Sequence, residues 1–203
     1  DEPIMSTYAP AEMPVSATIV ATDGSQIPPN PHGAAFYYLL NMGTIVVHHA
    51  SGQPPEVICE PSLYYEDEHL RIPDRGPITA STVAARRTAA EMMALSEHAW
   101  RQRGEARPLL ALLDNPLLLI GMGHEVPERE QLQFNYLSAM TRLLEVNAGL
   151  AGYTDRPRSR YVVGLLHLLD PEPEQVVRCA LDKDGRLEGL QDTALYRRLL
   201  YSG

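Results

Sequence analysis

The segment SATIVATDGS, residues 16–25, carries the signal that decides the fold. Residues 16–21 are small or β-branched, which is typical of a buried strand. The residues that follow, Thr22-Asp23-Gly24-Ser25, predict a turn, because Asp can bond its own backbone and Gly adopts a positive φ without strain. A functional interpretation stands beside this one, since acids at the ends of sheet strands often line metal or substrate sites. Asp23 is thus either a turn residue or a ligand.

Two further strands are expected before the first long helix. Residues 34–48 are rich in aromatic and β-branched types and are interrupted at Gly43. This pattern predicts a long or bulged strand, or two strands in a hairpin. Residues 56–59 predict a third strand, and the polar, acidic residues 61–76 predict a loop.

Helices and strands alternate in the rest of the chain. Residues 77–103 are rich in good helix formers and predict a helix with N-caps available at Ser81 and Thr82. The unbroken apolar run 108–113 is expected of a strand covered on both faces. A helix over 128–147, a strand over 149–153 and helices within 156–169 and over 192–201 follow. This order favours an α/β fold, with a ribonuclease-H-like mixed sheet flanked by helices.

Composition limits the classes of function. The chain has 203 residues, 17 Lys and Arg against 26 Asp and Glu, and a net charge of -9. This balance argues against gripping nucleic acid by bulk electrostatics, but an enzyme acting on nucleic acid remains compatible with it. No apolar run reaches the ~20 residues of a membrane span, and no export signal is recognisable. We therefore expect one domain over residues 1–203, located in the cytoplasm and not in a membrane.

Two more acids join Asp23 as candidates for one site. Asp114 repeats its pattern, because an apolar strand runs directly into it. That strand rises about 20 Å at ~3.3 Å per residue, and an antiparallel helix covers this height in roughly 13 residues. Counting back from Gly104 reaches Glu91. An ion pair between Glu91 and Arg87, one turn earlier, is an equally weighted structural alternative.

Three carboxylates at one sheet edge indicate a divalent cation. Without one, they would repel each other and lose hydration. Oxygen ligands select Mg²⁺ or Mn²⁺ over zinc, and a pair of such ions can activate water and stabilise the leaving oxygen of a phosphodiester. The predicted chemistry is hydrolysis of a phosphodiester at Asp23, Glu91 and Asp114. Hydrolysis of another phosphoester would use the same acids.

Segments along nearly the whole chain resemble the NurA nuclease family, in the family's order. They are ATDGSQIPPNPHGAAFYYLLNMGTIVVH (21–48), RRTAAEMMAL (86–95), PLLALLDNPLLL (108–119), YLSAMTRLLE (136–145), GLAGYTDRPRSRYVVGLL (149–166) and LQDTALYRRLL (190–200). The resemblance implies a ribonuclease-H-like core with manganese-dependent 5′-to-3′ exonuclease and single-strand endonuclease activity, magnesium being a possible substitute. By position, Asp23 matches the first metal-binding acid, Glu91 the helix acid, Asp114 the second strand acid and Tyr136 an aromatic residue near the site.

The resemblance also implies partners. The family acts on single-stranded DNA or double-stranded ends, and works with the hexameric HerA ATPase in DNA end resection for homologous recombination and repair. The nuclease itself is a homodimer. Arg156, Arg158 and Arg160 form a basic cluster in this acidic chain. They are candidates for contacting DNA phosphates, with a plain solvated loop as the alternative.

Two departures from the family pattern support a different role. The second motif of the family usually reads Asp-Gly-Ser-Leu, whereas residues 114–117 read Asp-Asn-Pro-Leu. Pro116 removes a backbone donor, and the freedom of glycine is lost. The family's C-terminal stretch, which contains a site histidine, is expected to be missing after Gly203. The alternative function is a catalytically weakened NurA-like module for protein–protein interaction with a HerA-type ATPase or with its own copy.

Overall fold

The computed structural model describes residues 12–73, 75–104, 107–117, 126–154, 158–167 and 189–201. They belong to two compact units, Asp1–Tyr153 and Thr154–Gly203. The expected single domain over residues 1–203 stays a prediction. Within this described part of the chain, no helix combines the length and the hydropathy that crossing a bilayer requires.

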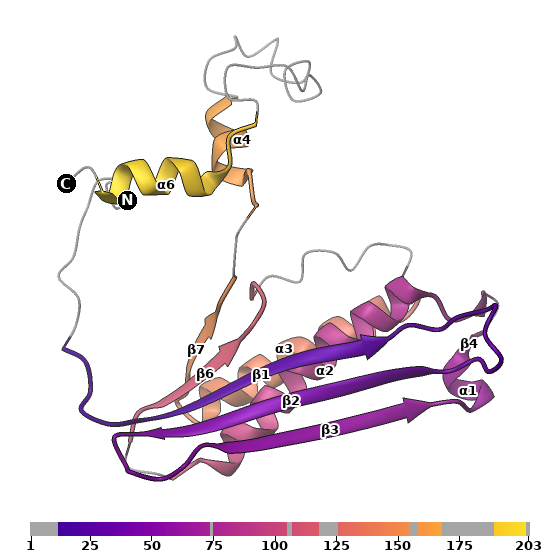
Figure 1. Ribbon diagram of the computed structural model, residues 1–203, viewed down its shortest axis with the longest axis horizontal. Coiled ribbons are helices and arrows are strands. Elements are labelled where there is room, and N and C mark those ends of the chain that lie inside the picture. Colours follow the sequence, from indigo (N-terminus) through magenta and orange to yellow (C-terminus); the bar gives the residue numbers. More distant parts are fainter. Residues whose placement is uncertain are drawn as a thin grey trace. The chain divides into compact units, whose positions relative to one another are not determined.

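A five-stranded mixed sheet forms the centre of the first unit (Figure 1). The strand order is β3-β2-β1-β6-β7, in which β1, β2 and β3 are antiparallel neighbours and β6 and β7 run parallel to β1. This topology confirms the expected α/β fold with a ribonuclease-H-like mixed sheet. The strands are β1 (Ala17–Ile27), β2 (Tyr38–His49), β3 (Glu56–Tyr64), β6 (Leu109–Leu113) and β7 (Gly149–Gly152).

Two long helices, α2 (Ala80–Arg101) and α3 (Arg129–Glu145), lie along the same face of the sheet (Figure 1). Their apolar side chains and those of the strands share one buried core, which includes Val20, Val46, Met92, Leu95, Leu113 and Leu143. Burial alternates along β1, as the two-residue period of a strand requires. Gly24 is buried towards the helices, whereas Asp23 and Ser25 are exposed.

The turn predicted at residues 22–25 is wrong, because β1 continues through it to Ile27. Asp23, Gly24 and Ser25 pair in antiparallel register with Gly43, Met42 and Asn41 of β2. Gly24 is not among the described residues with a positive φ. Another constraint therefore explains the glycine, and it comes from a helix packed against the strand.

Several predicted boundaries also change. Residues 34–48 contain the single strand β2, which runs through Gly43 without a hairpin. The predicted loop 61–76 holds the end of β3, α1 (Asp67–Leu70), β4 (Arg71–Ile72) and the start of β5 (Gly76–Pro77). The N-cap of α2 is Thr79, whose side chain accepts a hydrogen bond from the backbone N–H of Thr82. These short elements depend on tertiary contacts that local composition does not specify.

The expectation that β6 is covered on both faces is not met within the first unit. Leu109, Ala111 and Leu113 are buried towards the helices, but Leu110 is 36% exposed. The apolar run therefore has one buried side in this unit, as half-buried strands do.

The second unit contains α4 (Tyr161–His167) and α6 (Asp192–Tyr201), the latter with the predicted bounds. Asp192 joins the two helices at their N-terminal ends. Its carboxylate accepts hydrogen bonds from the backbone N–H groups of Tyr161 and Val163, each at 2.9 Å. Burial opposes ionisation of this carboxyl, but these N–H groups and Ser159 outweigh it and hold the pKa of Asp192 below its usual value.

Candidate active site

Asp23 and Asp114 lie at the same level of two neighbouring parallel strands. Thr22 of β1 pairs with Leu113 of β6, and each acid is the next residue along its strand direction. Both are exposed. The register thus places the two strand acids side by side at the end of β6, where sheets of this kind bind ligands.

The third predicted acid, Glu91, points from α2 into the sheet. Its side chain is fully buried, at 0% exposure. A Cβ atom built on Gly24 would lie 2.6 Å from Oε1 of Glu91, closer than real Cβ contacts come. Gly24 therefore leaves room for Glu91 to approach the backbone of β1, at the residue that follows Asp23.

The two oxygens of the Glu91 carboxylate have different surroundings. Oε2 accepts a hydrogen bond at 3.0 Å from the side-chain amide of Asn115. Oε1 is buried and has no hydrogen-bond partner within the described residues. Nη1 of Arg87 lies 3.4 Å from Oε1 and donates to the carbonyl oxygen of Gly24 at 2.8 Å. The Arg87 pair considered as an alternative is thus present, but it is not a surface bridge, because Glu91 is fully buried.

These surroundings shift the protonation of Glu91. Burial raises the pKa of its carboxyl to about 7, the charge of Arg87 opposes the rise, and the charge of Asp23 adds to it. A carboxyl with such a pKa exists in both protonation states near neutral pH. Perturbed acids of this kind are concentrated at functional sites.

Tyr136 borders the same site from α3. It is 1% exposed, and its hydroxyl donates to the carbonyl oxygen of Leu117 at 3.3 Å. Burial and the nearby charge of Glu91 raise the pKa of Tyr136. The aromatic residue predicted to lie near the acids thus lies within the electrostatic reach of Glu91.

The three acids do not bring one oxygen each to within 4.8 Å of the others. Among the described residues, that degree of closeness is reached by Glu66, Glu68 and His69, an acidic cluster at α1 whose two glutamates are exposed. Glu91 nevertheless fits a hard divalent cation, because its buried Oε1 has no hydrogen-bond partner among the described residues and the charge of Asp23 acts on the same carboxyl. The donor set is oxygen-based throughout, as Mg²⁺ and Mn²⁺ prefer.

The predicted basic cluster lies elsewhere in the chain. Arg156 falls outside the described residues, while Arg158 and Arg160 precede α4 in the second unit. Their predicted contact with DNA stays a prediction.

Asn115 is the site residue that sequence reasoning missed. In the sequence it stands out only as a departure from Asp-Gly-Ser-Leu, yet its side-chain amide donates to Glu91 of α2. That departure was the signal that could have found it.

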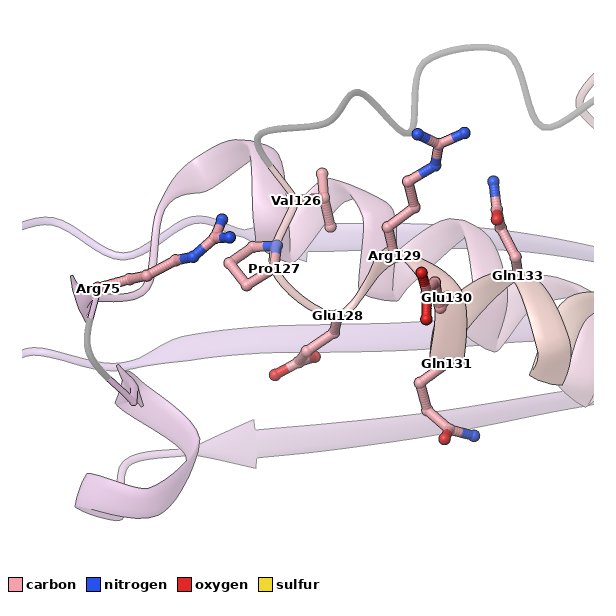
Figure 2. A pocket seen from close by; sticks show the side chains of 8 residues that line it. All are labelled: Arg75, Val126, Pro127, Glu128, Arg129, Glu130, Gln131 and Gln133. Carbon is pink, nitrogen blue, oxygen red and sulfur yellow. The ribbon is translucent and has the colours of Figure 1, made fainter.

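A separate cavity of about 670 Å³ lies at the N-terminal end of α3 (Figure 2). Nε of Arg86 donates to Oε2 of Glu128 at 2.9 Å, so one acid of the cavity already has a strong partner. The side chains that line the cavity are Arg75, Val126, Pro127, Glu128, Arg129, Glu130, Gln131 and Gln133. None of the four predicted site residues is among them.

The chain is distantly similar to several solved structures. No curated protein matches the chain. The NurA nuclease from Sulfolobus solfataricus is 11% identical with a TM-score of 0.48, over 82% of this chain and 55% of that one. A second NurA structure is 14% identical with a TM-score of 0.34, over 94% and 49%. LC9-RNase H1, a type 1 RNase H, is 11% identical with a TM-score of 0.31, over 78% and 72%.

The chain spans about half the length of both NurA structures, namely 55% and 49%. The family assignment itself comes from the family model, described as the NurA domain, which matches residues 17–203. This match includes both strand acids, the helix acid and Tyr136. The chain belongs to the NurA domain family.

Proposed function

We propose that this chain is a divalent-metal-dependent DNA nuclease, which hydrolyses phosphodiester bonds at Asp23, Glu91 and Asp114 beside Tyr136. One observation carries the proposal. The carboxylate of Glu91 is buried against Gly24, and its Oε1, 3.4 Å from Arg87, has no hydrogen-bond partner among the described residues. A buried charge without full compensation is costly, and a cation at this position would remove the cost.

The residues of the chain have separable tasks in this function. Asp23, Glu91 and Asp114 would hold Mn²⁺, or Mg²⁺ in its place. Such an ion supplies a Lewis acid that polarises a phosphoryl oxygen and favours attack by water. Gly24 admits Glu91 to the strand, and Arg87 offers positive charge that favours the ionised form of Glu91. The hydroxyl of Tyr136 anchors the turn after β6 through Leu117.

Cleavage of a labelled single strand in the presence of Mn²⁺ tests the proposal. The variant Asp23→Asn should lose activity roughly 100-fold or more, the scale expected when one electrostatic contact is removed at a reacting centre. Asp67→Asn is the matched control, because Asp67 is an exposed acid that pairs only with Arg71 in α1 and β4 among the described contacts. Equal activity of Asp23→Asn and the unmodified chain would end the nuclease proposal.

The finer activity is part of the same proposal. We expect 5′-to-3′ exonuclease and single-strand endonuclease action, in the cytoplasm, during DNA end resection for repair by homologous recombination. Substrates labelled at either end distinguish the polarity, and a circular single strand isolates the endonuclease. Cleavage of a small aryl phosphate but not of DNA would indicate a different phosphoesterase using the same acids.

The proposed partners are a HerA-type hexameric ATPase and a second copy of the chain. Three apolar side chains on α3 support a protein interface, because Phe134, Leu137 and Leu144 are 66%, 56% and 71% exposed. Mass measurement in solution tests the homodimer, and co-elution with the purified ATPase tests the complex.

The second candidate is the catalytically weakened interaction module. It is favoured by the separation of the acids, whose oxygens do not all come within 4.8 Å in the described residues. Calorimetry with MnCl₂ distinguishes the candidates. The module should bind Mn²⁺ no more tightly than millimolar, whereas the nuclease should bind it more tightly and through Asp23.

A further inference from the structure

Asn115 reaches Glu91 from a turn that is held at two points. Its side-chain amide donates to Oε2 of Glu91 at 3.0 Å. On one side, the carbonyl oxygen of Asn115 packs so closely on Gly152 of β7 that a Cβ there would lie 2.6 Å from it. On the other side, the carbonyl oxygen of Leu117 accepts the hydroxyl of Tyr136. The turn therefore presents the amide of Asn115 from a fixed backbone.

Pro116 contributes to the same arrangement. A residue that precedes proline is largely excluded from the helical region, because the proline ring clashes with its backbone. The backbone angles φ and ψ of Asn115 are therefore restricted mainly to the extended region. The sequence Asn115-Pro116 thus combines a donor side chain with a local restriction that limits where this donor can point.

The hydrogen bond distinguishes the two oxygens of Glu91. The outer torsion of a glutamate is broad and roughly two-fold, so a free carboxylate exchanges its oxygens easily. Here Oε2 accepts the hydrogen bond of Asn115, while Oε1 lies against Gly24 and has no hydrogen-bond partner in the part of the chain that the structure describes. The contact with Asn115 therefore selects which oxygen faces Gly24 and Arg87.

We propose that Asn115 is a positioning residue for the metal site: it holds Oε2 of Glu91 so that Oε1 remains the oxygen available to a divalent cation. This inference rests on the proposed nuclease function and deepens it. Outer partners that orient a metal-binding side chain typically change metal affinity 10–100-fold when they are removed. The residue acts through Glu91, and no contact between Asn115 and substrate is needed.

The test is titration of the full chain with MnCl₂. Calorimetry and the electron paramagnetic resonance signal of free Mn²⁺ both measure the binding. Asn115→Leu keeps the approximate side-chain size and removes the donor, and Asn115→Ala is the second variant in case the leucine variant does not fold. The matched control is Asn135→Ala on α3, where the asparagine contacts Gln131. The Mn²⁺ dissociation constant should rise about 10–100-fold in both Asn115 variants and stay unchanged in the control.

A kinetic measurement separates positioning from a merely structural role. At saturating Mn²⁺, the kcat of the Asn115 variants should return close to that of the unmodified chain, with an unchanged KM for DNA. Lower thermal stability with an unchanged Mn²⁺ dissociation constant would overturn the inference.

The outcome with Asp23→Asn separates this inference from the proposed function. If Asp23→Asn abolishes Mn²⁺ binding while the Asn115 variants bind within twofold of the unmodified chain, the function stands and the positioning role is wrong. If Asp23→Asn binds Mn²⁺ as tightly as the unmodified chain, the proposed metal site fails, and the positioning role fails with it.

Discussion

Each unit of the described chain contains one buried carboxylate, and the two have opposite chemistry. Glu91 in the first unit is 0% exposed and Asp192 in the second is 5% exposed. The pKa of Glu91 is raised to about 7, whereas the pKa of Asp192 is lowered. Low solvent exposure alone therefore does not determine the protonation of an acid; desolvation by its surroundings and the donors around it both count.

The donors differ in kind. Both oxygens of Asp192 accept backbone N–H groups at the start of α4, so the carboxylate satisfies donors that a helix N-terminus leaves free. Glu91 has one amide donor, an arginine 3.4 Å away and a contribution from the backbone of Gly24, and among the described residues its Oε1 has no hydrogen-bond partner of normal geometry. The carboxylate of Asp192 is satisfied by the backbone of α4, whereas the carboxylate of Glu91 is only partly satisfied by the described residues. The comparison predicts that changes at Glu91 affect activity, while changes at Asp192 affect local stability.

The largest expected effect is the loss of nuclease activity in Glu91→Gln. The substitution keeps the shape of the side chain but removes the negative charge, so the site loses a cation ligand. Cleavage of a labelled single strand at saturating DNA and Mn²⁺ should fall roughly 100-fold or more. Asp192→Asn, the same chemical change at the other buried acid, should retain near-normal cleavage. Loss of activity in both variants alike would remove the distinction between the two acids.

The pH dependence of stability should also have opposite signs for the two acids. Because the pKa of Glu91 rises from 4.5 to about 7 on folding, the metal-free chain loses stability as pH increases from 4.5 to 7. A shift of this size corresponds to about 3 kcal/mol. Urea unfolding between pH 4.5 and 8 measures it, and Glu91→Gln should lack this decline.

Asp192 provides the opposite case in the same measurements. Its lowered pKa means that its stabilisation is present above the ordinary value of 3.8 and is lost as pH falls through the folded value. Helical circular dichroism below pH 4 should therefore decline in the unmodified chain. A variant Asp192→Asn that declines with the same pH profile would show that Asp192 does not cause the loss.

The next largest effect is expected from a substitution at Gly24, the residue that the side chain of Glu91 approaches closely. In Gly24→Ala, the new Cβ would meet Oε1 of Glu91 at 2.6 Å, so the helix acid or the strand must move. Overpacking of this kind costs typically 1–3 kcal/mol, and the Mn²⁺ affinity should fall as well. Gly43→Ala is the matched control on β2, because its Cβ would lie 3.6 Å from the carbonyl oxygen of Asp23, an ordinary contact. Unfolding in urea and calorimetry with MnCl₂ measure both quantities, and equal effects of the two alanines would contradict the close-approach argument.

The part of the site that could be predicted from the sequence depends on local geometry. The rise per residue of a strand and of a helix selected Glu91 before its contacts were known. The structure places this residue against Gly24, next to Asp23. The strand pattern likewise predicted that Asp114 follows an apolar strand, whereas Asp23 lies inside β1 and not at its end. The register of β1 and β6 places the two acids at neighbouring levels.

The rest depends on contacts between distant segments. Asp-Gly-Ser predicted a turn because its own residues favour one, but pairing with β2 extends the strand through it. The contact of Asn115 with Glu91 requires the turn after β6 and the helix α2 to be placed relative to each other. No local period encodes that placement. The bounds of α6 were predictable because the residues of the helix itself set them. The hydrogen bonds of Asp192 to α4 were not predictable, because they join two separate segments.

The smallest expected effect is confined to the second unit, and it tests whether Asp192 has a structural role alone. Asp192→Ala removes both acceptors of the Tyr161 and Val163 N–H groups, so the first turn of α4 loses its side-chain cap. Limited proteolysis should cleave around α4 sooner than in the unmodified chain, while the Mn²⁺ dissociation constant stays within twofold. Asp192→Asn keeps one acceptor oxygen and should be intermediate. If Asp192→Ala changed the Mn²⁺ affinity as much as Glu91→Gln does, both acids would serve the metal site. Burial together with backbone donors would then no longer identify a purely structural carboxylate.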